Sequence, residues 1–509
     1  MNNASSEQSR RDTWKAVALL GVLTAAHIGL ALHFPLASDE TYYWEWSRAL
    51  DWGYYDQAPM IAWLIRASTA VFGSTEFGVR AGVVACASLT LWLVFVLGRE
   101  LFNSRAGLAA MLLAGITPMG LACGFIATYD VPLVLFWTAS MLSFARATRT
   151  PGGQWASWIA LGALAGMGML SKYTMALFLP CAALSVADRS DLRTWLRRPQ
   201  PYVSLLICVA VLSPNLVWLA NHDWVSLGHV GGLTMKGAGH TPVRRFGDYL
   251  GSQAGLITPL LFLGMMASMI AAARRRDEPS PHGLRLAFWF SVPVLLFFAA
   301  LSVKTKVQAN WAVCGWIGAS LGYAGWVWAT SANRRRTAFA QAGIVMAAAL
   351  SLLAGWPETR AALGLRVPAR LDQSRKMYGG RELGAAVARE VAAMAAAGRQ
   401  PVIGAVTYDV ASRMAFYTPG QPRVACLFLG TRDNQYRFLN AHSGLTAGSD
   451  MLIADHRPPD DPLLAPFAQT FERVEAVPSP VVVGVPRLYD VPVVTYYLYR
   501  CYGYRPIRQ

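Results

Sequence analysis

Long apolar blocks dominate the sequence and limit the chain to a fold that crosses a membrane many times. A transmembrane helix needs about 20 mainly apolar residues to cross roughly 30 Å of hydrocarbon. About eleven blocks approach that length, at residues 14–35, 77–98, 106–127, 129–145, 155–170, 173–187, 202–219, 253–273, 284–302, 309–330 and 337–355. Because 54% of the residues are apolar and only 15% are charged, an ordinary soluble fold is not expected. We predict a polytopic α-helical membrane protein with about 11 transmembrane helices.

The positive charges between the blocks predict the orientation of the chain. Short loops rich in Lys and Arg stay on the cytoplasmic side. With the N-terminus inside, the cytoplasmic segments contain Arg10, Arg11, Lys15, Arg99, Arg105, Arg146, Arg149, Arg189, Arg193, Arg197, Arg198, Arg274 to Arg276 and Arg334 to Arg336. An odd number of spans then places the C-terminus outside. The net charge of +16 lies mostly in these turns, so topology accounts for it and nucleic acid binding is not expected.

The first apolar block has two interpretations. Arg10, Arg11 and Lys15 precede it, and it ends in Pro35, Leu36 and Ala37, which is the order found in a cleaved signal peptide. The block is longer than the apolar part of a usual signal peptide. This length favours an uncleaved transmembrane helix.

The composition changes after about residue 356 and predicts a second domain. Charged residues return, a helix is expected at 382–397, and strands are expected at 401–406, 424–429, 451–454, 481–485 and 488–499. About 140 residues can bury a core of their own. We therefore predict a tail at 1–13, a transmembrane domain at 14–356 with outer loops at 36–76 and 220–252, and an outer mixed α/β domain at 357–509.

Polar residues gather where several apolar blocks reach the outer side. Asp39 and Glu40 open the stretch SDETYYWEWSRALDWGYYDQAPM, which also contains Glu45, Asp51 and Asp56. The others are Asp130 in ATYDVPLVLFW, Lys172 and Tyr173 in LSKYTM, and Lys304, Lys306 and Asn310 in VKTKVQANW. Ionisable groups at membrane depth are costly, so they tend to pair or to mark function. Interfacial anchoring by Lys304 or Lys306, and an aromatic belt around Asp39, remain alternatives.

Carboxylates and cations on one outer face suit a reaction whose donor is an anionic lipid. If a sugar is carried by a polyprenyl phosphate, Lys or Arg can stabilise the phosphate that leaves. A carboxylate can then act as general base on the acceptor hydroxyl. The chain has no Walker A motif, no H-E-x-x-H and no D-x-D pair. The outer residues His222, His229 and His240 have spacings of seven and eleven, which match no common metal site. No cofactor is therefore expected to be required, and a divalent metal at these histidines remains an alternative.

These stretches together resemble the membrane glycosyltransferases of the GT-C class, in particular the bacterial aminoarabinose transferases acting on lipid A and the protein O-mannosyltransferases. SDETYYWEWS resembles the family's first acidic motif, which implies a catalytic role for Asp39 with Glu40 beside it. TYDVPLVLFW resembles the second acidic site and implies a catalytic role for Asp130. GMGMLSKYTMALFLP resembles a glycine-rich segment and points to Lys172, with Tyr173 beside it, in the substrate cavity.

Other segments extend the resemblance over almost the whole chain. GYYDQAPMIAW resembles a G-Y-[FY]-[DE]-[KH]-P-P-L stretch and places Asp56 at the donor. SPNLVWLANHDW, KVQANW with Asn310 and Trp311, and YDVASRMAFYTPGQP are similar to further family segments. The family's basic residue after the acidic one is Gln57 here, and the first proline of the pair is Ala58. Lys172, Arg244 and Arg245 are therefore the candidate cations for the donor phosphate, with Lys304 as a further one.

The resemblance implies inverting transfer of a sugar from a polyprenyl-phosphate donor to lipid A, lipopolysaccharide or a related glycan, on the periplasmic face of the bacterial inner membrane. The outer domain would then be periplasmic, and the partners would be the lipid donor, the acceptor and membrane lipids. A protein hydroxyl is an alternative acceptor. A lipid-linked sugar flippase or transporter is the alternative class, although transporters usually bind near the midplane through broken helices. Neither the sugar nor the acceptor can be read from the residues.

Overall fold

The computed structural model describes residues 3–149, 155–235, 241–274, 281–329, 333–365, 372–429 and 431–506. Two compact units divide the chain. The first unit comprises Met1–Leu30, Gln57–Leu64 and Arg80–Gly355, and the second comprises Ala31–Asp56, Ile65–Val79 and Trp356–Gln509. The second unit thus combines most of the predicted outer loop 36–76 with the C-terminal part of the chain.

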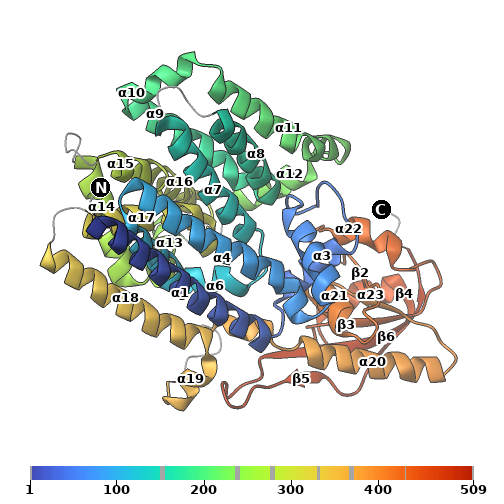
Figure 1. Ribbon diagram of the computed structural model, residues 1–509. Helices are drawn as coiled ribbons and strands as arrows, with labels where there is room; N and C mark the ends of the chain where they lie inside the picture. The colour runs from blue at the N-terminus through green and yellow to red at the C-terminus, as the bar shows by residue number, and fades with distance from the viewer. Residues whose placement is uncertain are drawn as a thin grey trace. The chain divides into compact units, whose positions relative to one another are not determined.

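Helices make up the first unit (Figure 1). They are α1 (Asn3–His33), α3 (Met60–Phe72), α4 (Glu76–Leu101), α5 (Ser104–Ile116), α6 (Pro118–Phe125), α7 (Asp130–Arg149), α8 (Trp155–Ser171), η1 (Tyr173–Leu177), α9 (Phe178–Asp188), α10 (Ser190–Arg193), η2 (Thr194–Arg197), α11 (Gln200–Asn221), α12 (Val225–Met235), α13 (Pro242–Ile257), α14 (Pro259–Arg274), α15 (Pro281–Trp289), α16 (Val292–Lys304), η3 (Ala309–Ala312), α17 (Val313–Trp328) and α18 (Arg334–Gly355). The last residues of α1, most of α3 and the first residues of α4 belong to the second unit.

Helices occupy all the predicted apolar blocks. Among the described residues, six helices are long and apolar enough to cross a membrane by themselves, and up to eight spans result if each bent pair counts as one. The pair α5 and α6 bends by 74° where Thr117 caps α6 and Pro118 begins it. The pair α13 and α14 bends by 104° at Thr258, whose φ of 74° is rare for a β-branched residue and precedes Pro259. The chain is therefore a membrane protein with a mainly helical fold.

Small residues let the helices of the first unit approach closely. Helix α8 lies between α7 and α11 (Figure 1). A Cβ atom at Gly162 would come within 2.3 Å of the Ser204 carbonyl oxygen, and one at Gly166 within 2.6 Å of Val211 Cβ. Gly168 is equally tight against the Met175 side chain. These glycines therefore let α8 pack closely against its neighbours.

The second unit contains a mixed sheet and several helices. Its helices are α2 (Ser38–Ser47), α19 (Pro357–Ala362), η4 (Gln373–Met377), α20 (Gly380–Ala396), α21 (Tyr408–Tyr417), α22 (Tyr436–Leu439), η5 (Asn440–His442), η6 (Pro462–Leu464) and α23 (Ala465–Thr470). Its strands are β1 (Val402–Ala405), β2 (Ala425–Cys426), β3 (Met451–Asp455), β4 (Phe471–Ala476), β5 (Val481–Val483) and β6 (Val494–Tyr504).

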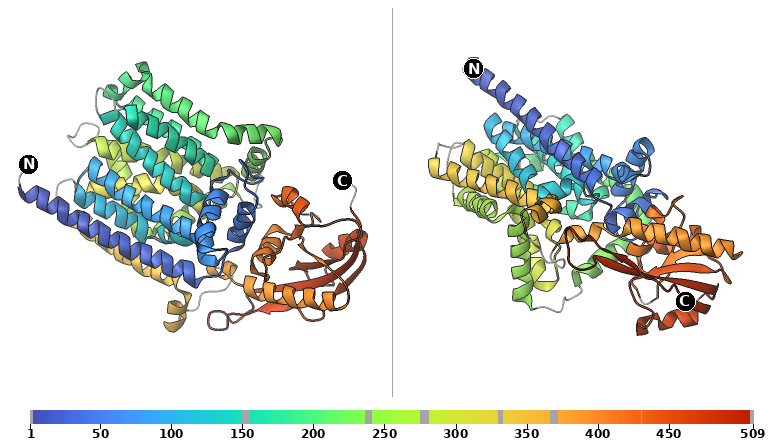
Figure 2. Two further views of the ribbon diagram at one scale, coloured as in Figure 1. Left: turned by 45° about the vertical axis from the view of Figure 1, so that its right-hand side comes forward. Right: turned by 90° about the horizontal axis from the view of Figure 1, so that it is seen from below.

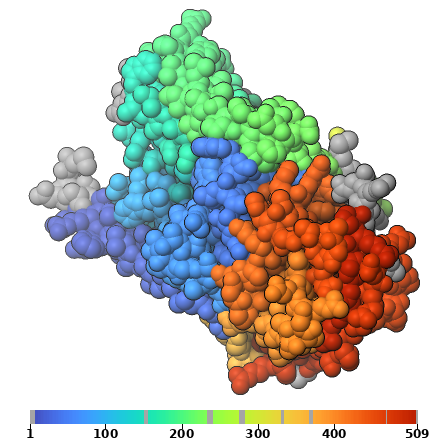
Figure 3. Space-filling view, turned by 90° about the vertical axis from the view of Figure 1, so that its right-hand side faces the viewer, coloured from blue at the N-terminus to red at the C-terminus, as the bar shows by residue number. Residues whose placement is uncertain are grey.

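The sheet has the order β2-β1-β3-β6-β4, and β5 also pairs with β6. Strands β1, β2 and β3 are parallel, whereas β6 pairs antiparallel with β3, β4 and β5. Helix α20 runs along the sheet (Figure 2), where Arg500 of β6 donates a 2.6 Å hydrogen bond to Glu390 of α20. Figure 3 shows the surface of the C-terminal part of this unit, which is coloured orange to red. The predicted helix 382–397 and α/β character are confirmed.

Three sequence predictions in the second unit need correction. The stretch after the first apolar block is not all loop, because α2 covers Ser38–Ser47 and α3 begins at Met60. The last strand spans Val494–Tyr504, not 488–499. Strand β4 was not predicted, since its sequence FERVEA has three charged residues and lies at the sheet edge, where only one face is covered.

Candidate active site

Helix α2 carries the acidic and aromatic stretch SDETYYWEWS. The backbone of Ala37 before it is extended, and the Glu40 carboxylate accepts a 2.9 Å hydrogen bond from the Ala37 backbone N–H. The carboxylates of Asp39 and Glu40 also complement the positive end of the helix dipole. Glu40 is fully buried. Its observed contacts hold the start of α2, and they leave Asp39 as the carboxylate of this pair that opens to solvent.

Asp39 lies on a cleft of about 390 Å³ within the second unit. This volume falls in the range of about 300–1,000 Å³ that small-molecule sites occupy. Segments distant in sequence form the walls: α2, η4, the start of α21, and residues around β6. The polar side chains that line it belong to Ser38, Asp39, Arg375, Lys376, Tyr378, Tyr408, Asp409, Arg413, His456 and Tyr496.

The carboxyl group of Asp39 has an unusual electrostatic setting. It is exposed to the cleft, yet protein atoms surround it on its other sides, and this desolvation raises its pKa above the ordinary value. A 3.3 Å hydrogen bond from the Tyr408 hydroxyl to Asp39 Oδ1 opposes the rise. The charges of Asp409 and Asp56 add to it, while Lys376 acts against it. Such a carboxyl group is suited to take up a proton.

A second ionisable pair lines the same cleft. His456 Nε2 lies 3.5 Å from Asp409 Oδ2. Burial works to lower the pKa of His456, but its hydrogen bond and ion pair with Asp409 produce a net rise. Burial works to raise the pKa of Asp409, and the bond with His456 produces a net fall. The pair therefore favours an imidazolium and a carboxylate that neutralise each other.

Asp56 forms a network with Tyr42, which precedes it, and with Arg432, which follows it by 376 positions. Tyr42 donates a 2.5 Å hydrogen bond to Asp56 Oδ2, and Arg432 donates one of 2.9 Å to Oδ1. The Tyr42 hydroxyl also accepts a 2.7 Å hydrogen bond from the backbone N–H of Gln435. Burial, followed by the charge of Asp56, raises the pKa of Tyr42 well above its ordinary value. Arg432 thus supplies a cation beside Asp56, where the neighbouring residue in sequence is the uncharged Gln57.

The first unit holds a separate polar cluster. Asp130, at the start of α7, accepts a 2.7 Å hydrogen bond from the Lys172 ammonium at Oδ1 and a 2.6 Å one from Asn310 Nδ2 at Oδ2. The exposed fractions of the side chains are 1% for Asp130 and 6% for Lys172. The Lys172 ammonium also lies 4.8 Å from the centre of the Tyr129 ring. Three residues predicted from separate segments therefore meet in one buried cluster.

The remaining predicted residues of the first unit lie around two other contacts. The Tyr173 hydroxyl donates a 3.2 Å hydrogen bond to Asn215 Oδ1, and Trp311 packs against Phe298 with ring centres 6.1 Å apart. Arg245 of α13 donates a 2.6 Å hydrogen bond to the carbonyl oxygen of Val303. This bond brings Arg245 to the end of α16, where Lys304 follows Val303.

Arg244 and Lys304 have exposed side chains. Neither has a hydrogen bond or an ion pair to its charged group within the described ranges, so both cations are open to a ligand.

Two of the three outer histidines, His222 and His229, lie within the described residues. His222 Nδ1 lies 2.8 Å from the Trp218 carbonyl oxygen, and its ring stacks on that indole. His240 lies outside the described residues. Within the described part of the chain, no group of three or more His, Cys, Asp or Glu residues could hold a metal ion.

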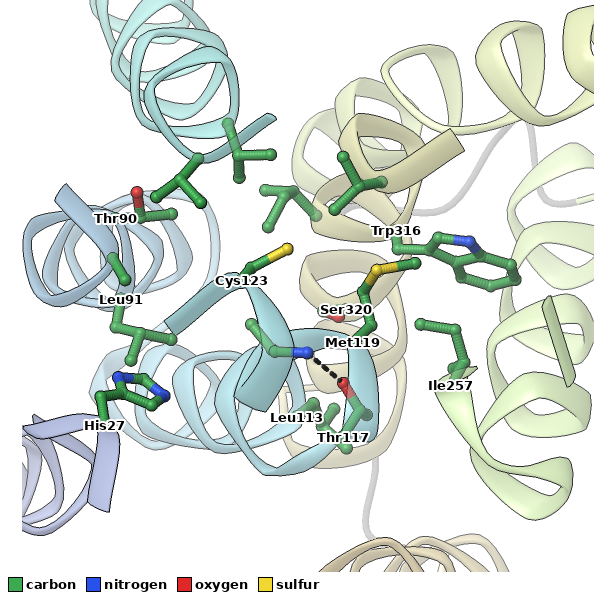
Figure 4. Close-up of a pocket in the computed structure, with 17 residues that line it drawn as sticks. His27, Thr90, Leu91, Leu113, Thr117, Met119, Cys123, Ile257, Trp316 and Ser320 are labelled. Atoms are coloured by element: carbon green, nitrogen blue, oxygen red, sulfur yellow. Dashed lines mark hydrogen bonds between the residues drawn. The ribbon is translucent and has the colours of Figure 1, made fainter. Parts of the chain in front are cut away.

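An apolar cavity of about 60 Å³ lies inside the first unit, between α1, α4, α5, α6, α7 and α17 (Figure 4). Thr117, Cys123 and Trp316 are among its lining residues. His27 also lines it, is 1% exposed, and has no hydrogen-bond partner for either ring nitrogen among the described residues. Its imidazole fits against Gly124, where an added Cβ would come within 2.1 Å of the ring. The cavity is small and largely apolar, so it offers little to a charged ligand.

Several residues around Asp39 were not singled out from the sequence: Lys376, Tyr408, Asp409, Arg432 and His456. Tyr408 and Asp409 begin the segment YDVASRMAFYTPGQP, which resembled a family segment, so that signal could have identified them. The other three lie in stretches without a comparable pattern.

Comparisons with known proteins support the predicted resemblance. Residues 56–218 match the family described as dolichyl-phosphate-mannose-protein mannosyltransferase. A lipid A galacturonosyltransferase, RgtD, from Rhizobium johnstonii is 27% identical over 285 residues, which cover 56% of this chain and 59% of that protein. An undecaprenyl phosphate-α-4-amino-4-deoxy-L-arabinose arabinosyl transferase from Pseudomonas fluorescens is 33% identical over 132 residues, covering 25% of this chain and 23% of that one. The chain thus matches less than two thirds of the length of these relatives.

A solved structure extends the similarity to nearly the whole chain. ArnT from Cupriavidus metallidurans, bound to undecaprenyl phosphate, superposes with a TM-score of 0.62 at 16% identity over 96% of this chain and 97% of that one. Its apo form gives the same TM-score over 98% of its length. The predicted resemblance to the aminoarabinose transferases and the protein mannosyltransferases is confirmed, and the fold is similar to that of ArnT.

Proposed function

We propose that this protein transfers a sugar, with inversion at the anomeric carbon, from a polyprenyl-phosphate-linked donor to an acceptor in the cell envelope. The first acceptor to consider is lipid A, lipopolysaccharide or a related glycan. The matched family, the lipid A and undecaprenyl phosphate relatives and the ArnT fold all support this assignment. We place the reaction on the periplasmic face of the bacterial inner membrane, with about 11 spans and a periplasmic C-terminal domain.

The observation that carries the proposal is the position of Asp39. This carboxyl group opens on a cleft of about 390 Å³, it accepts a hydrogen bond from Tyr408, and its pKa is raised by burial and by neighbouring carboxylates. A general base works best when its pKa approaches the operating pH. We assign Asp39 that role.

In the proposed step, the acceptor hydroxyl oxygen attacks the anomeric carbon of the donor sugar. The bond from that carbon to the phosphate oxygen breaks, and its electron pair leaves with the polyprenyl phosphate. Asp39 takes the hydroxyl proton, so charge and atoms balance. Attack opposite the leaving phosphate inverts the anomeric configuration. No metal enters the step, and activity should persist in EDTA.

The leaving phosphate needs a cation. We assign this role to the cations at the junction of α13 and α16, namely Arg244, Arg245 and Lys304. The charged groups of Arg244 and Lys304 are open to a ligand within the described ranges. Lys172 is neutralised by Asp130, so a donor phosphate would have to compete with that carboxylate. We assign Asp130, Lys172 and Asn310 to ordering the donor, with Tyr173 and Trp311 on the same unit.

The roles of two further acidic residues follow from their contacts. Asp56, held by Tyr42 and Arg432, is proposed to position sugar or phosphate groups of the donor, with Arg432 as the cation that Gln57 does not provide. Glu40 is proposed to position Asp39 through the start of α2, because its own carboxylate is fully buried.

The test is transfer of labelled sugar by purified protein in lipid nanodiscs, with polyprenyl-phosphate sugars as donors and lipid A as acceptor. We expect transfer from the lipid-linked donor and none from a nucleotide sugar alone. Mass spectrometry of envelope lipids from cells with and without the gene would identify the added sugar. Labelled protein in place of lipid would indicate the alternative acceptor, and movement of the donor across the bilayer without transfer would favour a flippase.

A further inference from the structure

The cleft beside Asp39 has an excess of positive charge that the proposed reaction does not use. Lys376 and Arg375 lie on the short helix η4, and both side chains line the cleft. Within the described residues, neither charged group has a hydrogen-bond or ion-pair partner. Two cations therefore face the cleft without a protein anion bound to them.

The other charges of the cleft are already satisfied. Asp409 and His456 pair with each other. Arg413, which is buried, donates to the carbonyl oxygens of Tyr378 and Lys376 and to the Tyr496 hydroxyl. Asp39 is the remaining anion, so its single negative charge faces the two cations of η4.

The segment that carries the two cations is held from both ends. At its start, Asp372 accepts hydrogen bonds of 3.0 Å from the Ser374 backbone N–H and 2.9 Å from the Tyr489 hydroxyl. At its end, Arg413 binds two backbone carbonyls, as described above. Gly379 follows with a φ of 99°, and an added Cβ there would come within 2.6 Å of Val494 Cγ1. A fixed backbone places the charges before a ligand arrives, which lowers the entropy cost of binding.

The remaining lining suits a sugar. Tyr378, Tyr408 and Tyr496 contribute aromatic surface, and Val493 and Val494 add apolar surface. Aromatic rings can pack against the face of a sugar ring, while the polar side chains around them can hydrogen-bond its hydroxyl groups. The cleft thus joins sugar-binding surface, two open cations and the Asp39 carboxylate in one space.

We infer that this cleft binds the acceptor, and that Arg375 and Lys376 hold an anionic substituent of the acceptor sugar, a phosphate or a carboxylate, while Asp39 faces its hydroxyl. The catalytic part of this inference rests on the proposed function, whereas binding of the anionic sugar does not. Arg375 and Lys376 select a charged acceptor, and Asp39 removes the proton from the same molecule.

The binding test uses purified full-length protein in nanodiscs of neutral lipid. Ligand-observed NMR measures glucosamine 1-phosphate, glucuronic acid and neutral glucosamine. We expect at least one anionic sugar to bind more tightly than glucosamine, and Arg375→Gln with Lys376→Gln to reduce that affinity by roughly tenfold or more. If glucosamine 1-phosphate binds more tightly than glucuronic acid, the acceptor carries a phosphate, and the reverse order indicates a carboxylate. Equal binding of charged and neutral sugars, or an unchanged double variant, would overturn the inference.

The kinetic test separates acceptor from donor. In the double variant, we expect the KM for the acceptor to rise, with little change in the KM for the donor, and Lys376→Arg to retain acceptor affinity. A rise in donor KM alone would assign the cations to the leaving phosphate and overturn the inference. Arg473→Gln is the matched control, since it removes an exposed positive charge from β4 of the same unit.

The two tests also separate this inference from the proposed function. If wild-type protein binds anionic sugars through η4 but transfers no sugar, the cleft assignment stands and the reaction is wrong. If it transfers sugar while Arg375→Gln with Lys376→Gln behaves like wild type, the reaction stands and the cleft assignment is wrong.

Discussion

The two units each contain a prominent carboxylate, and these carboxylates differ in how much of their charge is already satisfied. Asp130 in the first unit is buried and receives close hydrogen bonds from Lys172 and Asn310. Asp39 in the second unit faces a cleft and receives one 3.3 Å hydrogen bond from Tyr408. A charge placed in a membrane unit needs a partner in the fold itself. A carboxylate at an open cleft can remain available to a ligand.

This contrast indicates that the Asp130 cluster stabilises the fold, whereas Asp39 is available for the reaction. The Asp130 cluster is closed: its donors are internal, and loss of one would leave a buried charge unpaired. The Asp39 carboxyl group has a raised pKa and an open face. We therefore expect changes at Asp39 to affect reaction rate more than folding, and changes at the Asp130 cluster to affect folding first.

The largest effect is expected for Asp39→Asn. The amide keeps the shape but cannot act as a base, so the transfer rate should fall by roughly 10²–10⁴. Thermal stability in detergent should change little, because the side chain is exposed. The measurement is single-turnover transfer with equal amounts of folded protein. Wild-type rates in this variant would remove Asp39 from the mechanism.

Breaking the buried pair is expected to have the next largest effect. Lys172→Met leaves the Asp130 carboxylate with only Asn310, which should cost roughly 3–5 kcal/mol of stability. Asp130→Asn combined with Lys172→Met removes both charges and should restore part of the loss. The control is Arg146→Met, which breaks the more exposed pair with Glu100 and should cost less than about 1 kcal/mol. Equal thermal shifts for Lys172→Met and the control would contradict the contrast between the two units.

The elements of the first unit were largely predictable, because each apolar block is a local signal. Hydrophobic length alone located helices at all predicted positions, and charge between the blocks gave an orientation that awaits a topology experiment. The bend at Thr258 was not predictable, since it depends on one backbone angle at the join of two helices. The sequence placed Asp130 and Asn310 on the same outer face. It could not show that they form a hydrogen bond, because they lie 180 residues apart.

The cleft was the least predictable part. Asp39 stood out by its acidic and aromatic setting, but the residues around it come from segments more than 300 positions away. Lys376 lies in a short 3₁₀ helix, where no periodic pattern marks it. The Arg432 that binds Asp56 was missed for the same reason, because the two residues are close in space but 376 positions apart in sequence.

A smaller effect is expected for Tyr408→Phe, which tests the single hydrogen bond to Asp39. That bond favours the ionised carboxylate, so its loss should raise the pKa of Asp39 further. The acid limb of the pH-rate profile should move to higher pH, and the rate below neutrality should fall by roughly threefold to tenfold. Tyr502→Phe, which removes a hydroxyl bonded to the exposed Glu475, is the control. A limb that moves to lower pH would show that Tyr408 does not stabilise the ionised form.

The smallest effect is expected from breaking the Asp409–His456 pair, whose contribution to the stability of the protein should depend on pH. The raised pKa of His456 contributes stability that is fully present below the unfolded value of about 6.5 and is lost as pH rises through the folded value. The lowered pKa of Asp409 contributes stability above about 3.9, which is lost only as pH falls through its folded value. Of these two residues, only the histidine is expected to change charge between about pH 5 and 8.5.

Asp409→Asn should therefore destabilise the protein most near pH 5.5, and the difference from wild type should shrink toward pH 8.5. Because the two side chains are 35% and 41% exposed, solvent screening limits the effect to less than about 1 kcal/mol. The measurement is the thermal midpoint of both proteins across that pH range, with Asp433→Asn as the control for an exposed carboxylate paired with Arg437. A difference that grows with pH would contradict the assignment of the proton to His456.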